Sequence, residues 1–144
     1  ELESLRAKNK FSYVINVDPD INKINFKIPT LLMQPYVENA IWHGLVHKDG
    51  DGLLTIELKL SDAFLNSMLC SISDNGIGRK KAGEFNRLKV KSHQSLGTKI
   101  TLKRLEIMNS LFKTNCSVKY IDLVDHSGES SGTKVELILP IIKN

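Results

Sequence analysis

The feature that most constrains the fold is a helical pattern over residues 30–45, which contains the segment QPYVENAIWHG. On a helical wheel, one face gathers apolar and small residues, namely Met33, Val37, Ala40, Ile41 and Gly44. The opposite face carries Pro35, Asn39, Trp42 and His43, with Glu38 at its margin. Thr30 suits the N-cap, and Pro35 inside a helix costs about 3 kcal/mol, so we expect a kink or a later start there. The pattern predicts a core face opposite a face with polar chemistry.

Strands are predicted around this helix by period-two alternation. They cover residues 11–17, a short stretch near 24–28, a hairpin of 53–60 with 67–73, and a final pair at 116–124 and 133–139 joined by the loop 125–132. A second helix is predicted over 96–112, with apolar positions at Leu102, Leu105, Ile107, Met108 and Leu111. The order of these elements predicts an α/β fold in which one mixed sheet is covered by helices on one face.

The length of 144 residues suits one domain, which we place at residues 11–144. Residues 1–10 have too few apolar positions for an independent helix, so they are interpreted as the end of a helix that begins upstream. This stretch is too charged for a signal peptide, and no apolar run approaches the roughly 18 residues of a membrane span. Cys70 and Cys116 stand too far apart for a zinc ribbon or a redox pair, and we interpret both as reduced thiols.

The positive charge is concentrated in one segment. The chain has a net charge of +4, and residues 79–99 hold seven basic residues against Glu84 alone. A basic segment on a near-neutral body favours a local anion site. The aromatic residues are few and do not alternate with the basic ones, so we do not expect nucleic-acid binding.

Three further short segments follow the first helix: DNGIG at 74–78, SLGTK at 95–99 and GTKV at 132–135. In this order the four segments resemble the N, G1, G2 and final glycine-threonine boxes of the GHKL ATPase superfamily, in the form found in LytS-like sensor histidine kinases. The resemblance extends from about Phe11 to the end of the chain. It implies a Bergerat-type ATP-binding sandwich, a mixed sheet with helices packed on one face, that binds ATP and Mg²⁺.

The N-box resemblance assigns roles on the first helix. It makes Asn39 the Mg²⁺ ligand, since Mg²⁺ takes one or two protein oxygens and shares the rest with water and phosphates. It also makes Glu38 and Asn39 the catalytic residues, with Glu38 orienting water or the metal shell. Trp42 and His43 would contact the nucleotide, although helix packing is an alternative for His43. Trp42 departs from many relatives, which carry a phosphate-binding lysine at this position.

The other boxes imply the remaining contacts. Asp74 can accept a hydrogen bond from the exocyclic amine of adenine, and a carboxylate that only accepts favours adenine over guanine. The cofactor-binding set implied by the resemblance further includes Asn75, Gly76, Gly78, Leu96, Gly97, Thr98, Lys99 and Thr133. Gly97 and Thr98 open a helix whose free amides can hold phosphates. Residues 79–94 correspond to the ATP lid, which we expect to be a mobile basic loop in which Lys89 and Lys91 reach the phosphates.

The implied function is that of the catalytic part of a two-component kinase. It would donate the γ-phosphoryl group of ATP to a histidine on a separate dimerisation domain, for relay to a response regulator. The motif of that histidine is absent, since His43, His47, His93 and His126 stand in other contexts. The full protein is expected to be a homodimer anchored in the inner membrane, with this domain in the cytoplasm. Two alternatives stay open: another GHKL ATPase, disfavoured by Pro35 where hydrolysing relatives carry glutamate, and an interaction domain without nucleotide.

Overall fold

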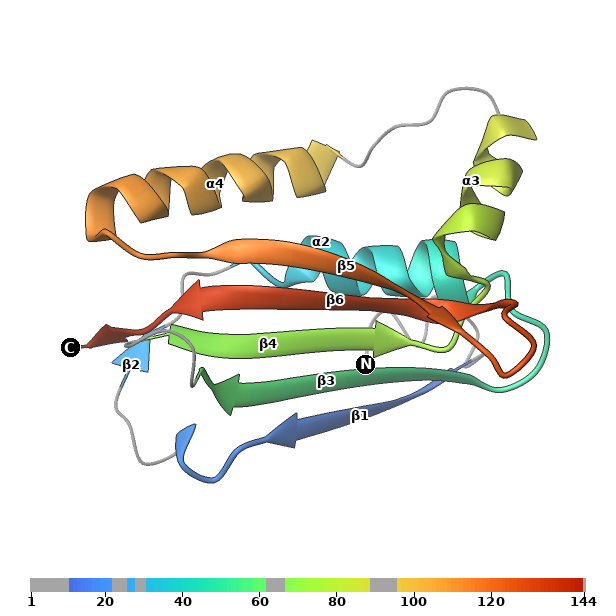
Figure 1. Cartoon of the computed structure of the whole chain (residues 1–144), viewed down its shortest axis with the longest axis horizontal. Helices are drawn as coiled ribbons and strands as arrows, with labels where there is room; N and C mark the ends of the chain where they lie inside the picture. The colour runs from blue at the N-terminus through green and yellow to red at the C-terminus, as the bar shows by residue number, and fades with distance from the viewer. Residues whose placement is uncertain (1–10, 22–25, 28–30, 62–66, 89–95, 144) are drawn as a thin grey trace.

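A computed structural model describes residues 11–21, 26–27, 31–61, 67–88 and 96–143. Five strands form the main sheet, in the order β1-β3-β4-β6-β5. They are β1 (Phe11–Val17), β3 (Gly52–Leu60), β4 (Ser67–Asp74), β5 (Ser117–Val124) and β6 (Ser130–Pro140). A second, two-stranded sheet pairs β2 (Phe26–Lys27) with β7 (Ile142–Lys143). The predicted α/β class with one mixed sheet is therefore confirmed (Figure 1).

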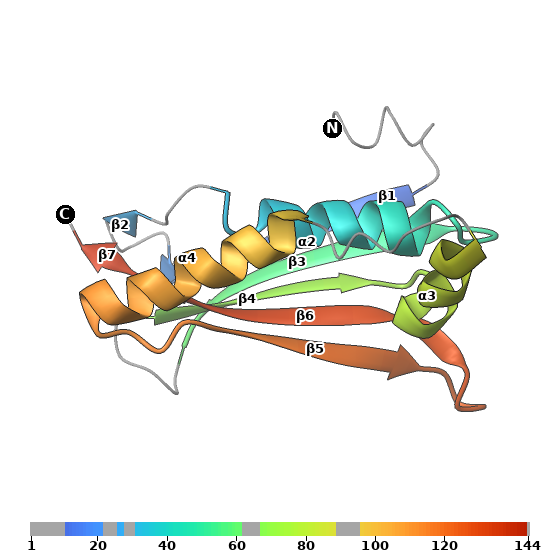
Figure 2. The same cartoon turned by 90° about the horizontal axis from the view of Figure 1, so that it is seen from above.

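The helices lie on one face of the main sheet, as predicted (Figure 2). They are α2 (Gln34–Asn39), the π-helix η2 (Ala40–Leu45), α3 (Gly78–Leu88) and α4 (Leu96–Phe112). The predicted hairpin is present, because β3 and β4 pair antiparallel with Ile56 opposite Ile72. The sequence did not predict that β1 would pair parallel to β3, which makes β1 an edge strand.

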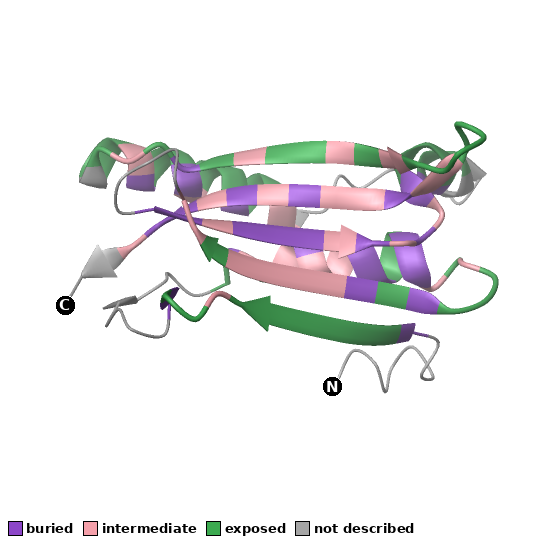
Figure 3. Ribbon diagram, turned by 60° about the horizontal axis from the view of Figure 1, so that its bottom comes forward, coloured by how far each residue is buried: buried purple, intermediate pink, exposed green. Residues whose placement is uncertain are grey.

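The core lies between the central strands and the helices. Met68, Cys70 and Ile72 of β4 and Leu137 and Leu139 of β6 are fully buried beneath the helices. Leu32, Tyr36, Ile41 and Leu45 supply the helix side of this core. Figure 3 shows that buried residues lie on β4 and β6, whereas the edge strand β1 is almost wholly exposed.

The first helix begins later than residue 30. Its first residue is Gln34, Met33 occupies the N-cap position, and Pro35 lies in the first turn, where a proline needs no hydrogen-bond acceptor. The late start that we expected is confirmed, whereas Thr30 lies outside the described residues. From Ala40 the helix widens into a π-helix, which no pattern in the sequence predicted.

The prediction of a basic loop over residues 79–94 is wrong in its first part. Residues 78–88 form the helix α3, whose alanine Ala82 is buried. Arg, Lys, Ala and Glu are strong helix formers, so this segment can be helical without a continuous apolar stripe. Residues 89–95, which include Lys89, Lys91 and His93, lie outside the described residues.

The bounds of α4 match the predicted helix, but only some of its apolar positions are buried. Leu105 and Met108 are buried together with Thr101. Three other apolar positions of the predicted helix, Leu102, Ile107 and Leu111, are 43%, 51% and 71% exposed. The helix is apolar on more than one flank, so its apolar positions alone do not define a core face.

Candidate functional site

A cavity of about 450 Å³ lies between the helices and the carboxyl end of β4. Each of the four described helices borders it, and the sheet contributes residues of β4, β5 and β6. The lining residues are Tyr36, Asn39, Ala40, His43, Gly44, Ile72, Asp74, Gly78, Arg79, Ala82, Gly83, Thr98, Lys99, Leu102, Tyr120, Thr133 and Val135. A cavity of this size can hold a small-molecule cofactor.

Seven of the predicted catalytic and cofactor-binding residues line this cavity. They are Asn39, His43, Asp74, Gly78, Thr98, Lys99 and Thr133. They come from all four motifs, so the fold brings together segments that are far apart in the chain. Six others lie outside the lining: Glu38, Trp42, Asn75, Gly76, Leu96 and Gly97.

Asp74 is the most buried charged residue of the site, with 4% of its surface exposed. It ends β4, opposite Thr133 of β6, and its Oδ1 accepts a hydrogen bond from the Gly76 amide at 2.9 Å. Burial raises the pKa of its carboxyl to about 6, against the lowering effects of the Gly76 and Thr133 amides and of the Lys48 charge. The group is therefore largely ionised at pH 7 and available as an acceptor.

Two glycines let η2 press against this carboxyl. A Cβ on Gly44 would lie 2.6 Å from Asp74 Oδ1, and a Cβ on Gly76 would lie 2.6 Å from the Gly44 carbonyl oxygen. The Ile77 amide donates to that same carbonyl at 3.3 Å. Gly76 thus shapes the site from behind the cavity wall, by allowing the backbone of η2 to approach the end of β4.

Asn75 holds the turn after β4 in place. Its Oδ1 accepts from the Leu53 amide at 2.7 Å, and its Nδ2 donates to the Asp51 carbonyl at 3.3 Å. Lys48 Nζ in turn donates to the Asn75 carbonyl at 2.8 Å. The side chain of Asn75 is therefore occupied in fixing Asp74 and does not face the cavity.

The helix α2–η2 presents Asn39 and His43 to the cavity. Burial, followed by the nearby His47, lowers the pKa of His43, so its imidazole is neutral at pH 7. Glu38 instead accepts a hydrogen bond from Gln34 Nε2 at 2.7 Å, and Trp42 is 38% exposed. These two residues lie apart from the group formed by Asn39 and His43.

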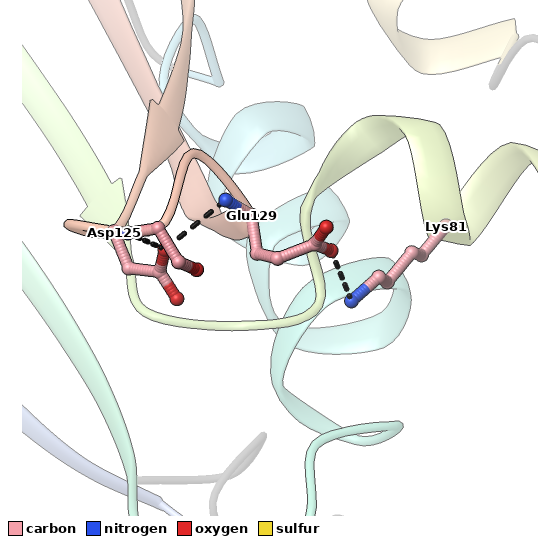
Figure 4. Close-up of polar contacts among 4 residues, drawn as sticks. Lys81, Asp125 and Glu129 are labelled. Carbon is pink, nitrogen blue, oxygen red and sulfur yellow. Dashed lines mark hydrogen bonds and ion pairs between the residues drawn. The ribbon is translucent and has the colours of Figure 1, made fainter.

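The first turn of α3 is fixed to the β5–β6 hairpin by two basic residues. The Arg79 guanidinium lies 4.8 Å from the centre of the Tyr120 ring, and its Nε is 3.7 Å from Asp122 Oδ1. Lys81 Nζ is 3.5 Å from Glu129 Oε2 (Figure 4). Gly78 begins the helix with a φ of +75°, a conformation that favours glycine.

Asp125 orders the loop that carries Glu129. Its Oδ1 accepts hydrogen bonds from the Ser127 amide at 2.8 Å, the Ser127 hydroxyl at 2.6 Å and the Glu129 amide at 3.0 Å (Figure 4). The hydroxyl and the two amides lower the pKa of the Asp125 carboxyl. The loop therefore presents Glu129 to α3 in a defined conformation.

Sequence reasoning missed Tyr36 and Tyr120 as part of the site. Their rings lie 6.2 Å apart at 56°, and burial raises the pKa of both hydroxyls. The Tyr36 hydroxyl is buried and has no hydrogen-bond partner among the described residues. Tyr36 stands within the first motif and could have been noticed there, whereas nothing in the alternation of β5 marks Tyr120.

Similar sequences include sensor kinases, although no family model matches the chain. YwpD of Bacillus subtilis (strain 168), described as an uncharacterized protein, is 29% identical over 94% of this chain. Sensor histidine kinase YpdA of Escherichia coli (strain K12) and sensor protein LytS of Oceanobacillus iheyensis are 34% and 35% identical over 54% of it. The chain's matched part spans 49% of YwpD and 13% and 12% of the other two.

Solved structures of histidine kinases share the fold. The histidine kinase domain of a blue-light activated kinase from Erythrobacter litoralis matches 97% of this chain and 56% of its own, at 12% identity and a TM-score of 0.61. The mycobacterial sensor histidine kinase MprB matches 99% of this chain and 91% of its own, at 16% identity and a TM-score of 0.58.

The fold is therefore that of a histidine kinase catalytic domain. The sequence similarity is to sensor proteins that include a sensor histidine kinase and LytS, and this confirms the resemblance seen in the four motifs. Among the described residues, no helix is long and apolar enough to cross a membrane.

Proposed function

We propose that this domain binds Mg·ATP and presents the γ-phosphoryl group to a histidine on a separate segment of a sensor kinase. The observation that carries this proposal is the cavity, which gathers Asn39, Asp74, Thr98 and Thr133 from four distant motifs. Since the chain spans about half of one relative and about an eighth of two others, the activity of the whole protein is part of the proposal.

The end of the cavity near Asp74 suits adenine. The buried carboxylate is an acceptor, and the exocyclic amine of adenine is a donor, which guanine does not offer at that position. Gly44 packs so closely on this carboxyl that a Cβ at position 44 would lie 2.6 Å from Asp74 Oδ1. Ile72 and Val135 supply apolar surface for a flat ring in the same cavity.

The part of the cavity that α4 lines suits phosphates. Thr98 and Lys99 line the cavity from the first turn of α4, where the helix dipole favours negative charge. Arg79 lines the same cavity from α3. This arginine adds positive charge to a cavity that Trp42, the position where the resemblance gives many relatives a lysine, does not line.

Asn39 suits the magnesium ion that accompanies the nucleotide. Its amide oxygen is a neutral ligand of the kind that Mg²⁺ combines with water and phosphate oxygens. When bound, the metal would neutralise phosphate charge. The protein would contribute position and charge, because phosphoryl transfer requires little covalent chemistry from its catalyst.

The phosphoryl acceptor is proposed to lie on the dimerisation domain of the same kinase, from which a response regulator would receive the phosphoryl group. None of the histidines in this chain stands in the acceptor motif of the family. The parent protein is proposed to be a membrane-anchored homodimer with this domain in the cytoplasm. Two of the relatives are named as sensor proteins, which supports the proposed place of this domain in a sensor kinase.

Calorimetric titration of ATP, with and without Mg²⁺, tests the proposal. Asn39→Ala should weaken Mg·ATP binding by about 1.5–3 kcal/mol, the scale of a charge-assisted contact, and metal-free ATP binding by less. Asn16→Ala, which removes an exposed asparagine on β1, is the matched control and should change neither affinity. Equal losses with and without the metal would remove Asn39 from the metal site, and no heat from wild-type protein would refute nucleotide binding.

A further inference from the structure

Helix α4 carries apolar side chains on three of its flanks. Leu105 and Met108 face the core, and Leu102 faces the cavity. A surface helix needs only one apolar flank to fold. The third flank, formed by Ile100, Ile107 and Leu111, is 52%, 51% and 71% exposed.

These three residues are aligned along the helix. At about 100° per residue, Ile100, Ile107 and Leu111 fall within an arc of about 40° and span about 16 Å of its length. On the same wheel, Thr98 and Leu102, which line the cavity, lie on roughly the opposite side. Single exposed apolar residues are ordinary, whereas an aligned set on a surface helix is a feature of binding surfaces.

Positive charge borders this α4 stripe. Lys103 and Arg104 lie on either side of it, and the exposed Lys113 follows the helix. The acidic residue of the helix, Glu106, is four residues from Leu102 and lies nearer the cavity side on the wheel. The surface is therefore apolar along its centre and basic at its edges.

We propose that the α4 stripe is a docking surface for an acidic amphipathic helix of another protein chain. Leucine-like side chains spaced at helical intervals would pack along Ile100, Ile107 and Leu111, and flanking carboxylates would meet Lys103 and Arg104. In Figure 1, α4 lies at the top of the molecule above β5, with no described element covering it. Because the stripe faces away from the cavity, the surface is independent of the proposed nucleotide site.

Nuclear magnetic resonance titration with a designed peptide tests this inference. The probe is a peptide of about three heptads with Leu at a and d and Glu at e and g, and the control peptide carries Lys in place of Glu. The acidic peptide should shift backbone amides of α4 between residues 100 and 111. Ile107→Ser combined with Leu111→Ser should weaken its binding about tenfold or more, because it removes two apolar contacts.

Val124→Ser is the matched control, since Val124 is 62% exposed on β5, and it should leave the peptide affinity within about twofold. Urea unfolding midpoints of both variants should stay close to wild type, because the substituted side chains are exposed. Equal binding of the Lys peptide, or shifts outside α4, would overturn the proposal. The proposal would also be overturned if the protein associated with itself, or bound anionic vesicles in place of the peptide, and this binding disappeared in the double variant.

Discussion

The buried carboxyl of Asp74 should make the stability of this domain depend on pH in a direction opposite to that of most carboxylates. Its pKa is raised from 3.8 to about 6 by burial. The pKa in the folded protein lies above the pKa in the unfolded chain. The contribution of this carboxyl to folding stability is therefore fully present below pH 3.8 and is lost as pH rises through 6. A shift of about two units corresponds to about 3 kcal/mol.

The assay is urea unfolding of the wild type and of Asp74→Asn between pH 3.5 and 8. Asparagine keeps the shape and the acceptor oxygen for the Gly76 amide, and it does not titrate. The free energy of unfolding of the wild type, relative to the variant, should fall by about 3 kcal/mol from the acidic to the neutral end of this range. Other titrating groups are common to both proteins and cancel in the difference.

Asp125→Asn serves as the opposite control. Hydrogen bonds from Ser127 and Glu129 lower the pKa of Asp125, so its contribution to stability is present at neutral pH and is lost as pH falls. If the difference in unfolding free energy between wild type and Asp74→Asn stayed constant with pH, the predicted effect of burial would be refuted. If the wild type instead became more stable relative to the variant toward neutral pH, Lys48 and the two amides would outweigh burial at this site.

Other predictions follow from burial, packing and motif content. Leu105→Ala should destabilise the domain by about 2–5 kcal/mol and Ile107→Ala by less than about 0.5 kcal/mol, as measured by urea unfolding, because only Leu105 is buried. Gly76→Ala should lower the melting temperature by forcing η2 away from Asp74, whereas Gly83→Ala, with no atom near its Cβ, should raise it. Asp74→Ala should abolish most discrimination between ATP and GTP in a competition assay, and unchanged preference would place adenine recognition elsewhere. After incubation with labelled ATP, the chain should carry no acid-labile phosphohistidine, and label on His43 or His126 would contradict the proposed division of roles.

Most strands of the main sheet and the ends of α4 could be predicted because their patterns are local, although β6 begins at Ser130, inside the predicted loop, and β7 was not predicted. β1 coincides with the predicted strand at residues 11–17, and the β3–β4 hairpin follows from two alternating segments close in sequence. The parallel pairing of β1 with β3 depends on which edge of the sheet is free, and no local pattern encodes this choice. Helix α3 was missed because its residues favour helix by propensity, and hydrophobic periodicity does not report propensity.

Residues of all four motifs line the cavity, but the motifs did not distinguish residues that line it from residues that support it. Asp74 and Thr133 line the cavity, whereas Gly76 and Asn75 act from behind its wall, through close packing and hydrogen bonds to neighbouring strands. Asp74, which lines the cavity, and Asn75 and Gly76, which support it, all stand in the five-residue segment 74–78. The difference between them depends on tertiary contacts between η2, β3 and β4, which the sequence does not show.

The first helix shows why separate core and chemical faces were too simple an expectation. The wheel placed Ala40 and Gly44 on the core face, away from Asn39 and His43, yet all four line the cavity. The helix becomes a π-helix at Ala40, so the side chains after Asn39 no longer follow a spacing of 100°. Ala40 and Gly44 are also buried, because the cavity floor and the packing of η2 on Asp74 share one side of the helix. Gly44 therefore lets the helix approach the carboxyl, and the small side chains at both positions leave space in the cavity for the proposed nucleotide.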